Sequence, residues 1–307
     1  MASLRPAKRR VAVTGVGVVS CCGIGKDAFF DGLCGPAPEG EHRVQGFDGS
    51  RFISDPKELR HTDRFAQLSV AAAALAIEDA GGIGGERGTT AGPDRTGVVF
   101  GTGVGGLATL QQQFSVLFTK GPRRVSPFLV PMIMGNAGAA AISIHHGLRG
   151  PCETVVTACA AGTQSIGNAY RLIAYGICDA MVAGGAEAAM EPGGDAPPIG
   201  VAAFSNMTAL SSSGWSRPFD VRRDGFVLAE GGGAVVLEEL EAARERGAHI
   251  YAEVIGTAST ADAHHITAPA PEGSGALSCM GLALEDAGLQ PQDVAHINAH
   301  GTSTPLN

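Results

Sequence analysis

The feature that most constrains the fold is an internal repeat. Residues 75–81 read LAIEDAG and residues 282–288 read LALEDAG, and both stretches read as the end of a helix stopped by glycine. In each place a short polar connector leads to an apolar strand that finishes in small residues, VVFGTG at 98–103 and HINAHGT at 296–302. A short match of helix-forming residues can arise by chance, but the shared helix-to-strand context argues against it. We therefore expect two similar halves.

The repeat divides the chain unequally. The first copy occupies residues 11–240, within a first domain at 1–247, and the second copy opens with a strand at 251–258, within a second domain at 248–307. The second copy extends only one strand beyond its first helix. A half-built sheet would leave an unpaired edge and uncovered apolar faces, which folded proteins avoid. This interpretation predicts either a truncated chain or a missing partner.

Strands and helices alternate along the first copy. A β-branched run at 11–19 indicates a buried strand, and an Ala- and Leu-rich stretch at 63–80 indicates a helix. The alternation predicts an α/β fold with a parallel or mixed sheet covered on both faces. Further strands are expected at 96–100, 154–157, 180–183 and 226–237, and further helices at 161–175 and 238–246.

Composition excludes several classes of protein. With 307 residues and 44% hydrophobic content the chain can bury a large core, and 45 glycines imply many tight turns. No apolar run approaches the roughly 18 residues of a membrane span, and residues 1–10 are basic without an apolar stretch, so a soluble, unexported protein is expected. Seven cysteines without a C-x-x-C pair disfavour zinc ribbons and disulfide scaffolds and favour the cytoplasm. We expect no metal.

The charge is distributed unevenly. A net charge of −8 argues against nucleic acid as the main partner, yet residues 95–152 contain no Asp or Glu. That stretch either presents a basic surface to an acidic molecule or is simply buried and apolar. Its basic residues are Arg95, Lys120, Arg123, Arg124 and Arg149.

Cys159 lies in TVVTACAAGTQSIG, where a β-branched strand meets a helix with an apolar face. The unpaired N–H groups and the dipole at a helix N-terminus favour an anion, and so favour the nucleophilic thiolate. Small neighbours leave room for a substrate. Buried cysteines commonly need no function, and we accept that interpretation for Cys21, Cys22, Cys34, Cys152, Cys178 and Cys279.

His300 lies in HINAHGTSTP, at the end of the strand expected in the second copy of the repeat. A histidine at a strand end is more often structural than catalytic. A cysteine and a distant histidine are nevertheless the two parts of a thiol-based acyl-transfer site. A rival motif, G-x-G-x-x-G at 101–106, predicts dinucleotide binding only with an acid about 20 residues later, and none occurs before Glu153.

Taken together, the motifs resemble β-ketoacyl-acyl carrier protein synthases, most closely the type II elongating enzymes. They span the chain in the family's order. The resemblance implies a thiolase fold, in which two similar halves with mixed five-stranded sheets form αβαβα layers, with the second half incomplete here. The matching segments are VAVTGVGVVS at 11–20, GTGVGGL at 101–107, GPRRVSPFLVP at 121–131, GLRGP at 147–151, TACAAG at 157–162, MVAGGAE at 181–187, SRPFDVRRDGFVLAEG at 216–231, DAHHIT at 262–267 and NAHGTSTPLN at 298–307.

The resemblance implies a chemistry for two residues. Cys159 would take an acyl chain as a thioester, and His300 would support decarboxylation of malonyl-acyl carrier protein, since neutral imidazoles can donate hydrogen bonds to an oxyanion. The enolate would then attack the acyl-Cys159 carbonyl and release a 3-oxoacyl-carrier protein. No resident cofactor is implied, because acyl chains arrive on the phosphopantetheine of acyl carrier protein.

It also implies roles for further residues, and a homodimer formed through the segment before Cys159. Thr302 and Thr304, with His265 and Thr267 of the DAHHIT segment, would bind the pantetheine arm. The acyl pocket would use apolar residues that could equally be ordinary core. These acyl-pocket residues are Val104, Met132, Ile133, Met134 and Phe204. The basic face for carrier-protein docking would comprise Arg123 and Arg124 with Lys57, Arg60 and Arg64.

Some family features are not in the sequence. They are a second catalytic histidine in GH-x-x-GAAG, a preceding lysine and a glycine-rich segment with a gating phenylalanine, and Thr208 stands where the family has a carrier-contacting arginine. These departures leave a second hypothesis, a non-catalytic acyl-binding or acyl-transfer-only partner subunit resembling chain-length factors, although such subunits lack the cysteine. Fatty-acid and polyketide pathways share these motifs, and nothing in them fixes chain length.

Overall fold

The computed structural model describes residues 8–36, 42–84, 87–190 and 197–306, and within them the strands form a single mixed sheet. The sheet runs in the order β2-β1-β6-β5-β3-β4, with β7 also paired to β1. β3 is parallel to β4 and β5, whereas β6 is antiparallel to β1 and β5. The strands are β1 Val11–Ser20, β2 Gly23–Ile24, β3 Thr96–Gly101, β4 Cys152–Glu153, β5 Ala180–Glu187, β6 Gly231–Glu239 and β7 Ala252–Val254.

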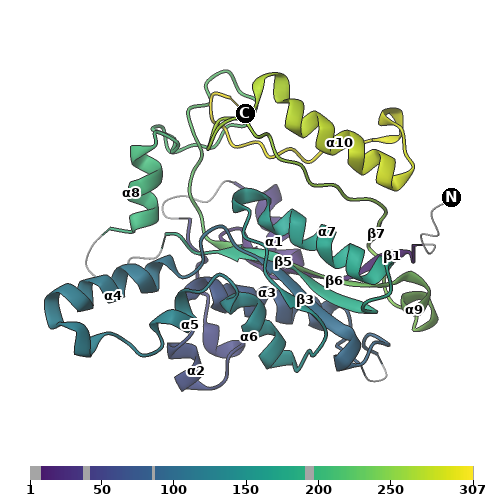
Figure 1. The fold of residues 1–307 in the computed structure, drawn as a ribbon, viewed down its shortest axis with the longest axis horizontal. Coiled ribbons are helices and arrows are strands. Elements are labelled where there is room, and N and C mark those ends of the chain that lie inside the picture. The colour runs from purple at the N-terminus through teal and green to yellow at the C-terminus, as the bar shows by residue number, and fades with distance from the viewer. Residues whose placement is uncertain (1–7, 37–41, 85–86, 191–196, 307) are drawn as a thin grey trace.

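Helices cover both faces of the sheet, as the alternating pattern predicts (Figure 1). Helices α3 and α6 lie on one face and α7 on the other. The helices are α1 Lys26–Cys34, α2 Pro56–Arg60, α3 Arg64–Asp79, α4 Leu107–Lys120, α5 Leu129–Ile133, α6 Ala137–His146, α7 Ala161–Ala174, α8 Ile199–Asn206, α9 Leu240–Glu245 and α10 Ser274–Ala287.

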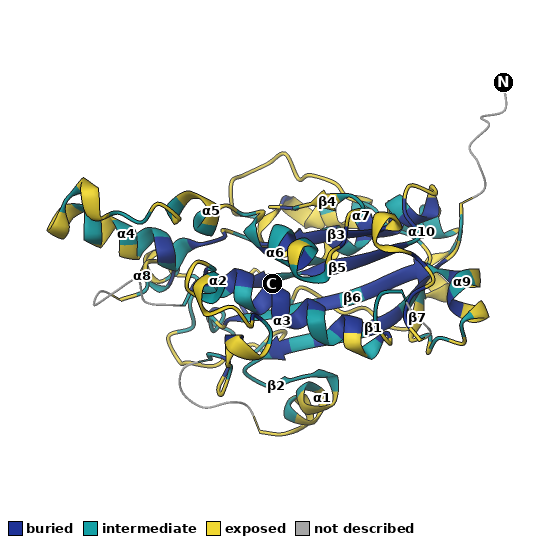
Figure 2. Ribbon diagram, turned by 90° about the horizontal axis from the view of Figure 1, so that it is seen from below, coloured by how far each residue is buried: buried dark blue, intermediate teal, exposed yellow. Residues whose placement is uncertain are grey.

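Side-chain alternation along β5 divides the core into two layers. Val182 packs with α3 and α6, whereas Met181 and Ala183 pack with Tyr170 and Ile173 of α7. All of β3 is buried, because both of its faces are covered, and the central strands are correspondingly dark blue in Figure 2. Full burial of a side chain such as Ile173 contributes about 1.5–3 kcal/mol. This packing fixes α7, and therefore its N-terminus, over β3 and β5.

The internal repeat is a structural repeat. A Cβ added at Gly15 in β1 would lie 2.2 Å from the carbonyl oxygen of Ala76 in α3. A Cβ added at Gly256, just after β7, would lie 2.7 Å from the carbonyl oxygen of Ala283 in α10. Both glycines thus let the LAIEDAG or LALEDAG helix lie directly on backbone.

The aspartate of the repeated motif has the same role in both halves. Asp79 accepts a hydrogen bond from the backbone N–H of Val16 at 2.9 Å, and Asp286 accepts one from the backbone N–H of Thr257 at 3.0 Å. Each carboxylate also pairs with a lysine, Lys26 for Asp79 and Lys8 for Asp286. The motif therefore ties a helix to the residue that follows a glycine, within β1 in the first half and just after β7 in the second.

The second half has less regular structure than expected. Residues 251–258 form only the three-residue strand β7, residues 296–302 form no strand, and α10 has no buried residue. The strand prediction for 296–302 is wrong for a physical reason. An isolated extended segment gains no ladder hydrogen bonds, and within the described residues no strand lies beside this one.

Two strand predictions in the first half also need correction. Residues 154–157 are not a strand, because the chain beyond β4 already turns toward α7, although the N–H of Thr102 still donates to the carbonyl of Val155 at 3.1 Å. Residues 226–230 do not pair with β5 either. Phe226 instead exchanges backbone hydrogen bonds with Ala209 and Ser211 at 3.0 and 2.9 Å, and β6 begins at Gly231.

All seven cysteines are free thiols, and they are less buried than expected. Of the six assigned no function, Cys178 is buried while Cys34 and Cys152 are exposed. Exposure leaves the Cys34 thiol accessible to reagents, so Cys34 is a suitable control for reactions at Cys159. Among the described residues, no helix is both long enough and apolar enough to cross a bilayer.

The start of β5 is fixed by an ion-pair cluster that predicts acid sensitivity. Arg95 donates to both carboxylate oxygens of Asp179 at 2.8 and 2.9 Å, Arg9 donates at 2.8 Å, and these bonds lower the pKa of Asp179 to about 2. Because the folded-state pKa lies below the unfolded value near 3.8, this stabilisation is present above pH 4 and is lost as the pH falls toward 2.

We predict that Asp179→Asn removes part of the acid sensitivity of unfolding. The partly exposed pair is screened by solvent, so the expected effect is about 1 kcal/mol, measured by urea unfolding at pH 5 and pH 3. Asp94→Asn is the matched control, because Asp94 pairs with Arg149 and both side chains are largely exposed to solvent. An equal loss of pH dependence in both variants would contradict the assignment.

Candidate active site

Cys159 lies at a strained turn between β4 and α7. The preceding residue, Ala158, has a φ of 51°, in the left-handed region that costs a residue with a Cβ about 1–2 kcal/mol. Residues 158–160 form a single 3-10 turn, and the 14-residue helix α7 begins at Ala161. The turn places an exposed thiol at the N-terminal end of a long helix, as the sequence predicts.

Glycines at the ends of β3 and β5 form the floor beneath this turn. A Cβ added at Gly101 would lie 2.6 Å from the carbonyl oxygen of Ala161, and one added at Gly185 would lie 3.2 Å from the Cα of Gly162. Gly101 and Gly185 are also paired with each other in the sheet. The first turn of α7 therefore packs on bare backbone, and a side chain on either strand end would push it away.

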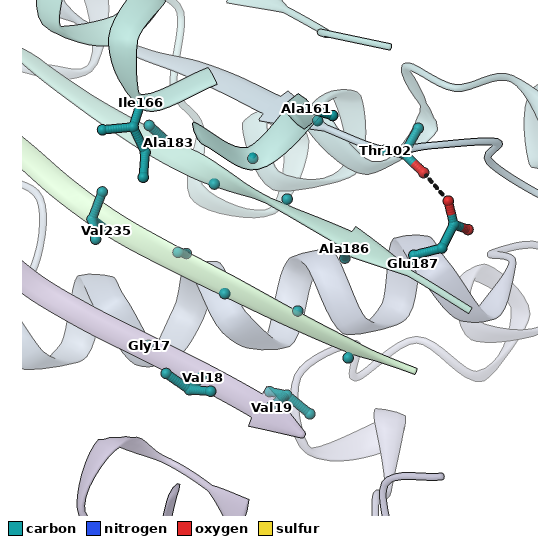
Figure 3. Close-up of a pocket in the computed structure, with 18 of the residues that line it drawn as sticks. Gly17, Val18, Val19, Thr102, Ala161, Ile166, Ala183, Ala186, Glu187 and Val235 are labelled. Atoms are coloured by element: carbon teal, nitrogen blue, oxygen red, sulfur yellow. Dashed lines mark hydrogen bonds between the residues drawn. The ribbon is translucent and has the colours of Figure 1, made fainter. Parts of the chain in front are cut away.

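A pocket of about 610 Å³ opens beside Cys159, between α7 and the ends of β1, β5 and β6. Figure 3 shows its apolar lining, with Ile166 of α7 facing Ala183 and Val235 of the sheet. Among its lining residues, Glu187 is the one with a charged side chain. A largely apolar pocket with a thiol at its edge suits an acyl chain bound to sulfur.

Glu187 organises the loop that carries the G-x-G-x-x-G motif, and sequence reasoning assigned it no role. One carboxylate oxygen accepts hydrogen bonds from the Thr102 hydroxyl at 3.1 Å and from the N–H groups of Gly103 and Val104, both at 2.9 Å. The other accepts from Ala188 N–H at 3.1 Å. The loop's N–H groups therefore bind the protein's own anion, which agrees with rejecting the dinucleotide interpretation. The sequence did contain a signal for this residue, because Glu187 is the final residue of the family segment MVAGGAE.

His300 is exposed and is not among the residues lining this pocket. Its segment is anchored by Ser303, which is fully buried, has a φ of 63° and was not predicted. The Ser303 hydroxyl accepts from the Arg217 N–H at 2.7 Å, and its carbonyl accepts from the Gly225 N–H at 2.8 Å. Arg223 adds side-chain hydrogen bonds to the carbonyls of residues 304 and 305. Two distant sequence motifs are thus joined.

The four pantetheine candidates form two local pairs. The hydroxyls of Thr302 and Thr304 lie 2.8 Å apart, partly buried. The Nδ1 atom of His265 accepts from the N–H groups of Thr267 and Ala268 at 3.1 and 3.0 Å, in an exposed turn. None of the four lines the 610 Å³ pocket, so their predicted roles remain predictions.

Four of the five acyl-pocket candidates lie around the same loop. The Gly106 N–H donates to the carbonyl of Ile133 at 3.4 Å, so Met132 and Ile133 lie against the glycines that follow the half-exposed Val104. Phe204 lies elsewhere, on α8, in an edge-to-face contact with Phe226 at 5.4 Å between ring centroids. These residues do not line the pocket beside Cys159.

The basic docking candidates fall into two groups. The rings of His61 and Phe128 stack at 3.7 Å, which joins the exposed residues Lys57 and Arg60 to the segment that follows the exposed Arg123 and Arg124. Arg64 differs, because its guanidinium pairs with the carboxylate of Glu230, which is fully buried, at 2.6 Å. This interaction engages Arg64 within the fold, and we leave it out of the docking surface.

Comparison with known proteins agrees with this geometry. Family models for the β-ketoacyl synthase N-terminal and C-terminal domains match residues 35–243 and 251–307. The chain is 43% identical to 3-oxoacyl-[acyl-carrier-protein] synthase 2 of Synechocystis sp. This alignment covers 98% of this chain and 74% of the relative. It is 47% identical to the synthase of the same name from Staphylococcus aureus, over 82% of this chain and 61% of the relative.

The chain belongs to the β-ketoacyl synthase family. Solved ketosynthases share its fold: an ishigamide ketosynthase/chain length factor superposes with a TM-score of 0.85 at 34% identity, over 98% of this chain and 75% of that one. A type II polyketide ketosynthase in complex with its acyl-carrier protein superposes with a TM-score of 0.81 at 30% identity, over the same shares of each chain. These comparisons confirm the thiolase-like fold and the acyltransferase class that the motifs imply. Enzymes of this class extend fatty-acid or polyketide chains.

The glycine floor makes a prediction about this β-ketoacyl synthase. Gly101→Ala should displace the first turn of α7 and destabilise the chain by about 1–3 kcal/mol, because the nearest atoms are backbone. Gly162→Ala is the matched control, since its added Cβ would meet nothing closer than 3.9 Å. Urea unfolding and the rate of Cys159 alkylation by iodoacetamide measure the difference. Similar behaviour of the two variants would refute the close-packing account.

Proposed function

We propose that this chain catalyses the 3-oxoacyl-acyl carrier protein synthase reaction with Cys159 as nucleophile. The observation that carries the proposal is the Cys159 thiol, exposed at the N-terminus of α7 on a strained turn beside an apolar pocket. The thiolate attacks an acyl thioester, an acyl–Cys159 thioester forms as the bond to the carrier sulfur breaks, and the carrier leaves as a thiolate that takes up a proton from solvent. The helix N-terminus stabilises the thiolate and, through the Cys159 N–H, the oxyanion of the tetrahedral intermediate.

Condensation follows on the acylated cysteine. Malonyl-carrier protein loses carbon dioxide, and the electron pair of the broken C–C bond becomes an enolate. The enolate carbon attacks the acyl carbonyl, a new C–C bond forms, and the bond to the Cys159 sulfur breaks, which returns the thiolate. His300 is proposed to donate a hydrogen bond to the enolate oxygen. Every atom comes from the two thioesters, so no resident cofactor is needed.

We place the carrier protein on the basic surface formed by Lys57, Arg60, Arg123 and Arg124. Acyl carrier proteins are acidic, and clustered exposed cations speed and orient such an encounter. The Thr302 and Thr304 hydroxyls are proposed to hydrogen-bond the pantetheine arm. The exposed edge strand β4 and the residues that follow it are the proposed homodimer contact, and the free thiols suit the cytoplasm.

The nucleophile assignment predicts a selective loss of acylation. Cys159→Ala should abolish covalent transfer of a labelled acyl group from acyl-carrier protein, detected by intact-protein mass spectrometry. Cys34→Ala, which removes another exposed thiol outside the proposed dimer contact, should retain it. Acyl label on the Cys159→Ala variant would show that another residue is the nucleophile. Carbon dioxide release from malonyl-carrier protein by the unmodified chain would exclude the non-catalytic partner-subunit hypothesis.

The docking surface predicts a charge-reversal effect. Arg123→Glu with Arg124→Glu should raise KM for acyl-carrier protein at least tenfold and leave acylation by acyl-coenzyme A within twofold, because only the protein substrate contacts the surface. Arg244→Glu, an exposed arginine on α9, is the control. If KM changed equally for both substrates, these arginines would act on the site itself rather than on docking.

A further inference from the structure

Glu187 joins three parts of the site. It ends β5, its carboxylate binds the 102–104 loop that follows β3, and that loop lies against the turn before Cys159. A Cβ added at Gly103 would lie 3.1 Å from the carboxylate of Glu187 and 3.8 Å from the Cα of Ala158. The carboxylate and the strained residue therefore both lie close to the side of Gly103 on which a side chain would stand.

The contact is stronger than an ordinary loop hydrogen bond. Hydrogen bonds to an ionised carboxylate are roughly twice as strong as neutral ones, and one oxygen of Glu187 accepts three of them. Thr102 extends the network, because its hydroxyl also accepts from the Gly105 N–H at 3.2 Å. The loop is thus held at consecutive backbone positions, while Ala158 remains in a conformation that its own sequence does not favour.

We propose that Glu187 is a positioning residue for acyl transfer. Through Gly103 it supports the turn that aims the Cys159 thiol, and through the Val104 N–H it holds the loop whose Gly106 N–H donates to the carbonyl of Ile133. The role rests on the proposed function of Cys159. It assigns no substrate contact to Glu187, and it predicts that the carboxylate acts on the maximal rate of acylation rather than on substrate affinity.

Two variants separate the shape of the side chain from its acceptors. Glu187→Gln keeps the length and one acceptor oxygen but places an NH2 group against other donors, whereas Glu187→Ala removes every acceptor. Displacement of a reacting group by about 1 Å can cost roughly 100-fold in rate. We expect the maximal rate of Cys159 acylation by acyl-coenzyme A to fall about 3- to 10-fold in Glu187→Gln and at least 30-fold in Glu187→Ala.

Besides the maximal rate of acylation, the experiment measures three further quantities on the full 307-residue chain. KM should stay within threefold, and alkylation of Cys159 by iodoacetamide, a small reagent that needs no alignment, should also stay within threefold. Hydrogen exchange at the Gly103 and Val104 amides should accelerate at least tenfold. Glu241→Ala and Glu241→Gln, at an exposed glutamate on α9, are matched controls and should change none of these.

Distinct results overturn the positioning role and the proposed function. Unchanged acylation in Glu187→Ala, or equal losses of acylation and alkylation, would overturn the positioning role. If the unmodified chain were alkylated but never acylated, the proposed function would fail, and amide exchange alone would then decide whether Glu187 holds the loop. If Glu187→Ala does not fold, the same criteria apply to Glu187→Gln, with a threefold loss of rate as the threshold.

Discussion

Close packing of backbone on backbone is the constraint on which this site depends. The first turn of α7 lies on the ends of β3 and β5, and Gly101 approaches the carbonyl of Ala161 too closely for any side chain. A helix fixed in this way cannot rotate or slide without breaking its contacts with the sheet. The strained turn at Ala158 is held between this helix and the loop after β3, and the Cys159 thiol is aimed as a consequence.

The same arrangement explains how a glycine-rich loop can serve acyl rather than phosphate chemistry. Consecutive N–H groups at 103 and 104 would attract an external anion if they were free. Glu187 supplies that anion internally, so the pocket beside them stays apolar apart from one carboxylate that is already hydrogen-bonded. Positive charge lies instead on the molecular surface, at the exposed basic residues of α2 and of the segment before α5. An acidic protein partner can bind there without entering the pocket.

Local features could be predicted from the sequence, and contacts between distant residues could not. The β-branched run of β1, the Asp63 cap of α3 and the small residues around Cys159 each carry their signal within a few positions. The hydrogen bond between Thr102 and Glu187 joins residues 85 positions apart, and the Arg64–Glu230 pair is formed across 166. Such pairs depend on strand order, which local periodicity does not specify.

The incorrect strand predictions have the same origin. Residues 296–302 have the composition of a strand, but a strand is stable only beside another strand. The segment is instead held by side chains, with Ser303 buried against residues 217–225 and Arg223 bonded to the carbonyl of Thr304. The repeat could be recognised in the sequence because Asp79 and Asp286 perform the same local task, each accepting the N–H of a residue that follows a glycine, in β1 or just after β7.

The most direct test is a crystal structure of the chain after reaction with an acyl thioester. The account predicts an acyl group on the Cys159 sulfur, with its carbonyl oxygen accepting a hydrogen bond from the Cys159 N–H at the N-terminus of α7. Glu187 should remain bound to the 102–104 loop. An acyl group on another cysteine, or a carbonyl oxygen turned away from the helix N-terminus, would contradict it.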